Sequence, residues 1–376
     1  MKKLKVGFIG YRGMVGSVLI NRMLEEGDFA HIDPVFFSTS NPHGNTYPIN
    51  GTVYKLHDAY DIEQLLMLDV IISTHGGEYT NTMYCKLEQN NYTGFWLDAS
   101  SNLRMKDNAV IVLDPINRAV IDKALASGVK LFIGGNCTVS LMLLALGGLF
   151  ANDLVEWVSS ITYQAVSGAG ANNMRELLQQ WHMVAQNSQA ILNDNKHSIL
   201  ELDAKINQLI NSEHLPRNYF DYPIAGNVLP WIDVAMANGQ TKEEWKGGAE
   251  ANKILGLVPN TINIDGMCVR VGAMRCHSQA LTIKLKDKNL SVTAIEKIIQ
   301  EHNPWVTVVA NNKQDTLSKL TPAAISNTLK VAIGRLRKLN FGDDFLGAFT
   351  VGDQLLWGAA EPIRRMLNII IKHHAN

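Results

Sequence analysis

The stretch KVGFIGYRGMVGSVLI, residues 5–20, decides the fold of the first part of the chain. A short apolar run, 5–9, precedes three glycines spaced as GxxGxxG, Gly10, Gly13 and Gly16, and an apolar helical pattern follows. Strand, glycine-rich turn and helix in this order are typical of a dinucleotide-binding unit, because glycine lets the backbone approach a pyrophosphate at the helix N-terminus. A glycine-rich turn without any ligand is the alternative interpretation of the same residues.

The first 135 residues continue this alternation. Short β-branched or aromatic runs are separated by stretches whose apolar residues recur at helical spacing. The alternation predicts an α/β fold with a doubly wound, parallel (Rossmann-type) sheet. The expected strands are 5–9, 34–38, 70–74, 94–98, 110–114 and 130–134, and the expected helices are 14–26, 61–68, 80–90 and 117–127.

The remainder of the chain has a different order of elements. Two long helical patterns, 171–192 and 241–256, come first, and a strand-rich block that includes 268–274 and 279–286 follows them. Runs of strands with segregated helices predict an α+β second domain. A helical tail begins near residue 354, and its pattern leaves open which domain it packs against.

Composition narrows the class of protein. The 376 residues include 34 basic and 35 acidic side chains, a balance that excludes a strongly basic nucleic-acid-binding surface. The longest apolar stretches, near 141–150 and 366–371, are shorter than the roughly 20 residues of a membrane span, and the N-terminal segment lacks a signal peptide's apolar core. Four cysteines without metal-binding spacing suit a reducing compartment. We expect a cytoplasmic protein without metal, nucleic-acid or membrane partners.

The end of the second expected strand bears on the choice of cofactor. NAD-binding units usually place a carboxylate there to bind the ribose 2′-hydroxyl, whereas this strand ends in Ser38, Thr39 and Ser40. Hydroxyl groups together with the guanidinium of Arg12 would accept a 2′-phosphate that a carboxylate would repel. The residues therefore favour NADP. A simple turn built from the three hydroxyls is the alternative.

One cysteine lies where a nucleophile is expected. In GGNCTVSLMLLALGG (134–148), Cys137 marks the change from a glycine-bounded turn to an apolar helix. A helix N-terminus stabilises a thiolate and lowers the pKa of the thiol, which predicts a nucleophilic cysteine. We expect Cys85, inside a helical pattern, to be an inert core residue, and Cys268 and Cys276 to be bystanders.

A nucleophilic cysteine needs a partner that handles protons. Among the histidines, His277 is favoured over His182, because it follows Arg270 within a strand-rich segment and a guanidinium can bind a carboxylate or phosphate. Arg104 follows the end of an expected strand, where open α/β sheets bind ligands. A surface arginine is the alternative interpretation of Arg104.

Taken together, these motifs resemble the aspartate-β-semialdehyde dehydrogenases of the Gram-negative bacterial type, and the resemblance runs essentially from end to end. Against sister reductases that also form a cysteine thioester, the EEWKG and RCHSQA segments favour this family. The segments that carry the resemblance are GFIGYRGMVGSVL (7–19), PVFFSTS (34–40), ASSNLRMKD (99–107), GGNCTVSLML (134–143), TYQAVSGAGA (162–171), EEWKGGAEANKIL (243–255), VRVGAMRCHSQA (269–280), HNPW (302–305) and FTVGDQLLWGAAEP (349–362).

The resemblance implies roles for individual residues. Cys137 would be the nucleophile, His277 the acid–base group, and Gln164 would orient the substrate. Arg270 would bind the substrate α-carboxylate and Glu243 its α-ammonium. The resemblance further assigns the phosphate to Arg104 and Lys246, and NADP(H) to Gly10, Arg12, Gly13, Met14, Val15, Thr39, Ser40, His75, Ser167, Gly168, Ala169, Gly170, Ala171 and Gln354.

The implied reaction is the NADPH-dependent reductive dephosphorylation of β-aspartyl phosphate to aspartate β-semialdehyde, with inorganic phosphate released. It belongs to the aspartate-family pathway that leads to lysine, threonine, methionine and diaminopimelate. The implied domains are 1–135 with 355–376 for NADP, and 136–354 for catalysis and homodimer formation. A reductase of N-acetylglutamyl phosphate and a catalytically silent nucleotide-binding protein remain the alternatives.

Two places depart from the pattern of the family. His75 stands where glutamine is expected, and we expect an effect on cofactor affinity at most. The stretch 187–217 matches only loosely and carries none of the residues named above.

Overall fold

The first sheet is built around strand β1, which leads into the glycine-rich turn. The computed structural model describes residues 3–40, 45–194 and 196–375, and within them this sheet has eight strands in the order β3-β4-β2-β1-β5-β6-β8-β7. Its pairs are parallel except β3 with β4, which confirms the predicted doubly wound fold. The strands are β1 (Leu4–Ile9), β2 (Ile32–Ser38), β3 (Thr46–Ile49), β4 (Thr52–Asp58), β5 (Val70–Ser73), β6 (Phe95–Asp98), β7 (Ala109–Val112) and β8 (Leu131–Gly134).

The order of these strands places a ligand-binding crevice. The chain passes from β1 to β2 on one side and later to β5 on the other, so the order reverses at β1. In open α/β sheets, ligands bind at this point, outside the carboxyl ends of the strands. Gly10, Ser38 and Thr74 follow or end these three strands and therefore lie along that edge.

The hairpin β3–β4 was missing from the expected elements. Its turn is Asn50-Gly51, and both residues have positive φ, 46° and 79°. An Asn-Gly pair between two strand-like runs is a strong hairpin signal, because it adopts the tight turn that matches strand twist. The signal was present in the sequence, but the short flanking runs carry little apolar alternation.

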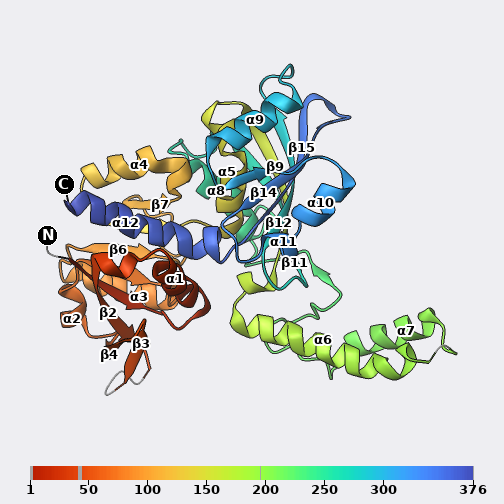
Figure 1. Cartoon of the computed structure of the whole chain (residues 1–376), viewed down its shortest axis with the longest axis horizontal. Coiled ribbons are helices and arrows are strands. Elements are labelled where there is room, and N and C mark those ends of the chain that lie inside the picture. Colours follow the sequence, from red (N-terminus) through yellow and green to blue (C-terminus); the bar gives the residue numbers. More distant parts are fainter. Residues whose placement is uncertain (1–2, 41–44, 195, 376) are drawn as a thin grey trace.

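The C-terminal helix α12 (Glu361–Ala375) packs on the first sheet, which answers the question that the sequence left open. Ile363 and Leu367 share one apolar core with Phe8 and Phe132, and Figure 1 shows this helix lying beside the N-terminal strands. The other helices of this half are α1 (Met14–Glu25), η1 (Asp28–His31), α2 (Ile62–Leu66), α3 (Gly77–Gln89) and α4 (Asp114–Ala126).

The second sheet contains both antiparallel and parallel pairs of strands, and with its helices it forms the expected α+β domain. In the described chain it has seven strands in the order β10-β11-β9-β12-β15-β14-β13. Helix α5 lies against it with nearly every residue buried. The strands are β9 (Val155–Gln164), β10 (Val228–Leu229), β11 (Asn263–Val271), β12 (His277–Leu285), β13 (Val306–Val308), β14 (Val331–Leu339) and β15 (Gly342–Gly352). The helices are η2 (Val166–Gly168), α5 (Cys137–Ala151), α6 (Ala171–Leu192), α7 (Ile199–Ile210), α8 (Lys242–Ile254), α9 (Val292–His302), α10 (Lys313–Lys319), α11 (Pro322–Ile325) and η3 (Leu356–Ala360).

Three details differ from or go beyond the expectations. Helices α6 and α7 form an arm that extends from the second domain, and the loosely matching stretch 187–217 lies in it (Figure 1). Cys85 lies in α3 as expected but is exposed, because its side chain is on the face of the helix turned from the sheet, so assigning it to the core was wrong. The domain limits stay predictions, and their outer ends, residues 1 and 376, lie outside the described residues.

Within residues 3–40, 45–194 and 196–375, none of the helices combines the length and the apolar character needed to cross a membrane.

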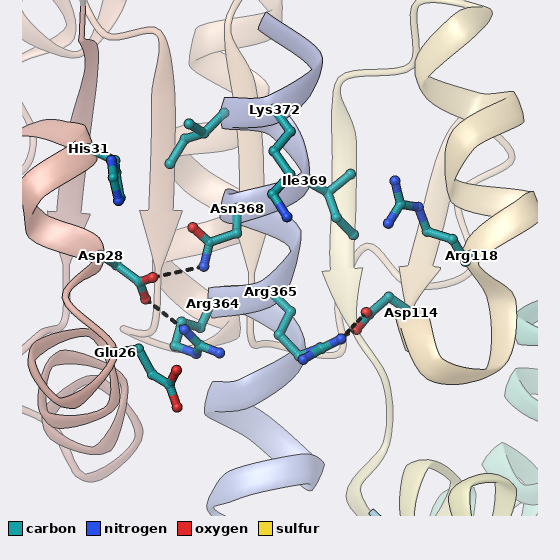
Figure 2. A pocket seen from close by; sticks show the side chains of 11 residues that line it. Glu26, Asp28, His31, Asp114, Arg118, Arg364, Arg365, Asn368, Ile369 and Lys372 are labelled. Atoms are coloured by element: carbon teal, nitrogen blue, oxygen red, sulfur yellow. Dashed lines mark hydrogen bonds and ion pairs between the residues drawn. The ribbon is translucent and has the colours of Figure 1, made fainter. Parts of the chain in front are cut away.

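Buried and partly buried ion pairs attach α12 to its neighbours. Arg364 donates to Asp28 at 2.9 Å and to Glu361 at 2.8 Å, while Arg365 forms a two-point pair with Asp114 at 2.6 and 2.7 Å. Asp28, Asp114, Arg364 and Arg365 line a cavity of about 460 Å³ along the helix, shown in Figure 2. Since the carboxylates of Asp28 and Asp114 already have arginine partners, we interpret these ion pairs as structural contacts that hold α12 against its neighbours.

Replacing Arg364 by Ala should therefore destabilise the protein. The change leaves the buried Asp28 and Glu361 without their main counter-charge, which typically costs about 3–5 kcal/mol. Urea unfolding followed by circular dichroism measures the loss. Arg118→Ala is the matched control, because Arg118 lines the same cavity but its ion-pair partner is the exposed Asp122, and the change should cost less than about 1 kcal/mol. An equal loss of unfolding free energy in the two variants would contradict the structural role of the Arg364 ion pairs.

Candidate active site

The glycine-rich turn after β1 fits a dinucleotide pyrophosphate. Gly10 has a φ of 80°, and its carbonyl accepts a hydrogen bond from the Gly13 N–H at 2.9 Å. A Cβ on Gly16 would lie 2.3 Å from that carbonyl oxygen, so the turn needs glycine there. The N-cap of α1 is Gly13, which has no side chain to cover the N–H groups of Met14 and Val15. Such uncovered groups at a helix N-terminus attract phosphate.

The residues proposed to distinguish NADP from NAD lie together. The Arg12 guanidinium donates to Ser38 Oγ at 2.8 Å and to Ser40 Oγ at 3.2 Å. In the described residues Arg12 makes no ion pair with a carboxylate. Thr39 and Ser40 are partly or fully exposed beside it. A cation ringed by hydroxyls is the environment that a 2′-phosphate requires.

His75 lies at the same edge of the sheet. It follows β5, is exposed, and packs edge-on against Tyr79 with ring centroids 5.5 Å apart. The backbone of His75 also closes the glycine turn, because a Cβ on Gly10 would lie 2.6 Å from its nitrogen. The position is consistent with a cofactor contact, while its effect on cofactor affinity stays a prediction.

Cys137 is the first residue of α5, as the sequence predicts. Its N-cap is Asn136, whose Oδ1 accepts the N–H groups of Thr138 at 3.0 Å and Val139 at 3.2 Å. On the other side the cysteine meets Gly358, where a Cβ would lie only 2.5 Å from the Cys137 Cβ. The thiol is thus held between the start of α5 and the π-helical turn η3.

The expectation of a lowered thiol pKa is wrong for the protein without substrate. Burial of the sulfur, together with the negative charge of Glu243, raises the pKa of Cys137 to about 12. Arg270, Arg104 and the Thr138 N–H act in the opposite direction but do not compensate. Loss of hydration therefore outweighs the helix N-terminus, whose effect on an ion is modest.

Strand pairing brings three of the expected residues to one edge of the second sheet. Gln164 ends β9 and lies opposite Arg270 on the parallel neighbour β11. His277 begins β12, the antiparallel neighbour of β9 on its other side, where Ser278 pairs with Tyr163. Strand pairing thus makes neighbours of Gln164, Arg270 and His277, although the last two lie 106 and 113 positions after Gln164 in the sequence.

His277 is buried and neutral. Its Nδ1 accepts a hydrogen bond from the Ala165 N–H at 3.0 Å, and burial followed by the charge of Arg270 lowers its pKa to about 3. A neutral imidazole that accepts at Nδ1 carries its proton on Nε2. Nε2 has no partner among the described residues. A Cβ on Gly168 would come within 3.1 Å of it, so glycine leaves that N–H room for a ligand.

Glu243 is the centre of a hydrogen-bond network. Its Oε1 accepts from Asn136 at 2.9 Å and from Gln164 at 3.1 Å, and its Oε2 accepts from Lys246 at 2.9 Å. Burial alone would raise the pKa of Glu243, but Lys246 and the two amides lower it to about 2. The carboxylate is therefore ionised. Lys246 also binds Asp233 at 2.8 Å.

The pKa of Lys246 follows from the same contacts. Burial favours the neutral amine, but attraction to Glu243 and hydrogen bonds to Asp233 and Glu243 outweigh it and raise the pKa. Lys246 is thus a partly neutralised cation, not a free one.

Arg270 differs from the other expected cations. It is buried, and its Nη1 donates to the Ala165 carbonyl at 2.8 Å. Within the described residues it has no carboxylate partner in an ion pair, although Glu243 and Cys137 are near enough to influence its charge. Burial lowers its pKa. A buried cation that lacks a counter-ion is a strong binding position for an anionic group.

Arg104 is buried, so its interpretation as a surface residue was wrong. Its guanidinium binds Glu250 at 3.0 Å and the carbonyls of Gly134 at 2.7 Å and Gly135 at 3.1 Å. The sequence interpretation assigned Arg104, Lys246 and Arg270 to an anionic substrate, and the structure adds that Arg104 and Lys246 also have carboxylate partners in the protein. Their burial is the reason, since an unpaired buried charge is costly.

The sequence interpretation missed Asn136, Glu250 and Asp233. A signal existed for the first two: asparagine directly before a helix is a preferred cap, and Glu250 follows Glu243 by seven residues, which places both on one helix face. Asp233 lies in an irregular segment, and the sequence offers no sign that it meets Lys246.

The remaining residues assigned to the cofactor lie at a second place. Gln354 donates to Ser167 Oγ and accepts from the Cys276 N–H at 2.8 Å. Gly168, Ala169, Gly170 and Ala171 follow Ser167 through the turn into α6. Whether these residues contact the cofactor stays a prediction. The described residues contain no cluster of three or more His, Cys, Asp or Glu side chains arranged to hold a metal ion.

Family models match most of the chain. The NAD-binding domain of the semialdehyde dehydrogenases matches residues 5–124, and their dimerisation domain matches residues 146–357.

Solved structures of the same kind match over nearly the whole chain. An aspartate semialdehyde dehydrogenase from Francisella tularensis is 50% identical, with 98% of this chain and 99% of that chain covered and a TM-score of 0.92. Aspartate semialdehyde dehydrogenase II from Vibrio cholerae (21% identity, 99% of each chain, TM-score 0.79) and the enzyme with NADP from Candida albicans (16%, 99% and 98%, 0.65) share the fold. The chain belongs to the aspartate semialdehyde dehydrogenases of the semialdehyde dehydrogenase family.

Proposed function

We propose that this chain catalyses the NADPH-dependent reductive dephosphorylation of β-aspartyl phosphate to aspartate β-semialdehyde, through a thioester on Cys137. The observation that carries the proposal is the combination of Arg270, a buried cation with no carboxylate partner among the described residues, and the ionised Glu243. The pair matches the α-carboxylate and α-ammonium of a free amino acid. It argues against an N-acetylated substrate, whose nitrogen carries no charge.

The same pair would orient the substrate. With its carboxylate on Arg270 and its ammonium on Glu243, the side chain of the substrate would extend toward Cys137. Gln164, which binds Glu243 at 3.1 Å, would position the reacting group. Arg104 and Lys246 would bind the phosphate, each sharing its charge between the phosphate and a carboxylate of the protein.

Attack on the acyl carbon requires the thiolate of Cys137. The negative charge of Glu243 contributes to the high thiol pKa, so an ammonium bound to Glu243 would bring that pKa down. The sulfur–carbon bond forms, the bond between the acyl carbon and the phosphate oxygen breaks, and the leaving phosphate takes the proton that the thiol has lost. The Nε2–H of His277 would donate a hydrogen bond to the substrate oxygen while that oxygen carries negative charge.

The glycine turn and Arg12 fit NADP, and the Candida albicans protein, alike in fold, was solved with NADP. When bound, NADPH would supply the hydride that reduces the thioester. The dimerisation-domain match over 146–357 supports a homodimer. Exposed Tyr163, Trp231 and Met267 on or near the second sheet are consistent with such an interface.

In the reverse direction, the purified protein should oxidise aspartate β-semialdehyde only with both inorganic phosphate and NADP⁺, measured by NADPH absorbance. Cys137→Ala should lower the rate by roughly 10⁴-fold or more, because the nucleophile is lost. Cys85→Ala, at an exposed cysteine, is the control and should keep the rate. Oxidation without phosphate, or activity in Cys137→Ala, would refute the proposed route.

Cofactor preference should depend on Arg12. Arg12→Ala removes a charge-assisted contact to the 2′-phosphate, so kcat/KM for NADP should fall about 10- to 100-fold while that for NAD changes little. Steady-state kinetics with both cofactors measure the ratio. If kcat/KM falls equally for both cofactors, Arg12 does not distinguish them.

His277 should make the protein sensitive to acid. Its pKa is about 3 in the folded protein and 6.5 when unfolded, so its stabilising contribution is complete above pH 6.5 and decreases as the pH falls toward 3. The slope is up to about 1.4 kcal/mol per pH unit. His277→Gln should show a smaller loss of unfolding free energy between pH 6.5 and 4.5, above the range in which Glu243 titrates. An unchanged slope would mean that His277 is not held neutral.

A further inference from the structure

Glu250 is a buried carboxylate for which the proposed mechanism has no role. It lies on α8, two turns after Glu243, and is 2% exposed. Its Oε1 accepts from Arg104 Nη1 at 3.0 Å, and its Oε2 accepts from the backbone N–H of Asn136 at 2.7 Å. The two donors come from the turn after β6 and from the cap of α5. One side chain therefore joins three segments that are far apart in the sequence.

Arg104 is bound along much of its guanidinium. Of its five N–H bonds, three have partners among the described residues: the carbonyls of Gly134 and Gly135, and Glu250. Both glycines directly precede Asn136 and Cys137. Two N–H bonds are left for a ligand, and their direction relative to Cys137 is set by the three that are bound.

The same helix also holds Asn136 at a second point. Glu250 accepts its backbone N–H, and Glu243 accepts its side-chain amide at 2.9 Å. Asn136 in turn caps the helix that carries Cys137. Any shift of α8 would thus move the phosphate-binding arginine and the nucleophile together.

The charge of Glu250 opposes phosphate binding, since it weakens the positive potential of Arg104. A benefit to catalysis must come from geometry. We propose that Glu250 is a positioning residue that acts through Arg104 and sets the phosphate site at a defined place relative to Cys137. This inference rests on the proposed function.

The test is Glu250→Gln in the full-length enzyme. Arg104 and Asn136 donate to different oxygens of Glu250, and a glutamine replaces one of these oxygens by an NH₂ group, so one of the two donors would face another donor. KM for inorganic phosphate should rise about 10- to 100-fold, the scale of a misplaced binding group. KM for the aldehyde should stay within about twofold, because Arg270 and Glu243 hold that substrate. A role as counter-charge alone predicts the opposite, a lower KM for phosphate, and that result would overturn the proposal.

Glu250→Asp separates geometry from charge. It keeps the negative charge but is one methylene shorter, so it cannot reach both donors, and KM for phosphate should again rise. If Glu250→Gln does not fold, Glu250→Asp still tests the proposal. A phosphate KM like that of the unaltered enzyme in Glu250→Asp would overturn the proposal.

Glu244→Gln is the matched control. Glu244 lies on the same helix and likewise accepts two hydrogen bonds, in its case both from backbone N–H groups, Thr241 at 2.7 Å and Cys268 at 3.2 Å. This variant should lose stability and keep both KM values within about twofold. In an Arg104→Ala background, Glu250→Gln should add little to KM for phosphate, because Glu250 acts through Arg104. A full additional rise there would contradict the proposal.

Titration calorimetry with inorganic phosphate alone separates this inference from the proposed function. If the aldehyde is not oxidised but phosphate binds, and binds at least tenfold more weakly to Glu250→Gln, the positioning role stands and the proposed reaction fails. If phosphate binds equally to both proteins, or to neither, the positioning role is wrong whatever the activity.

Discussion

The carboxylates of Glu243 and Glu250 hold the start of helix α5, and the rest of the site depends on that attachment. Asn136 caps α5 with its side-chain oxygen. Its backbone N–H donates to Glu250, and its side-chain amide donates to Glu243. Since α5 fills the core of the second domain and follows β8 of the first sheet, this junction is where the two halves of the chain meet. The position of Cys137 therefore depends on a helix cap that lies at the junction of the two domains.

The charges of the site follow from its burial. Arg104 and Lys246 have carboxylate partners because unpaired ions are costly away from water, while in the part of the chain that the structure describes Arg270 binds a backbone carbonyl and no carboxylate. The same burial keeps the Cys137 thiol protonated and His277 uncharged. Positive and negative side chains thus balance in the site. In the proposed mechanism, a substrate ammonium on Glu243 would lower the pKa of the Cys137 thiol.

Local sequence patterns predicted the helices and strands well, but they predicted poorly which side chains are buried and which residues contact each other. The helix expected at 171–192 is α6 with those limits, and the six strands expected for the first sheet lie within a few residues of their predicted positions. The Asn50-Gly51 hairpin was overlooked although its signal is local. The exposure of Cys85 and the burial of Arg104 could not be derived, because both depend on what a distant segment covers.

By itself the sequence determined the fold class, the position of the nucleotide-binding turn, and Cys137 at a helix start, since glycine spacing, apolar periodicity and capping act over a few neighbouring residues. Only the tertiary structure decided the state of the site. Strand register brings Gln164 beside Arg270, α12 returns to the first sheet, and Glu250 reaches Arg104 across 146 positions. The physical reason is that pKa values and ion pairing depend on burial and on partners that only the folded chain brings together.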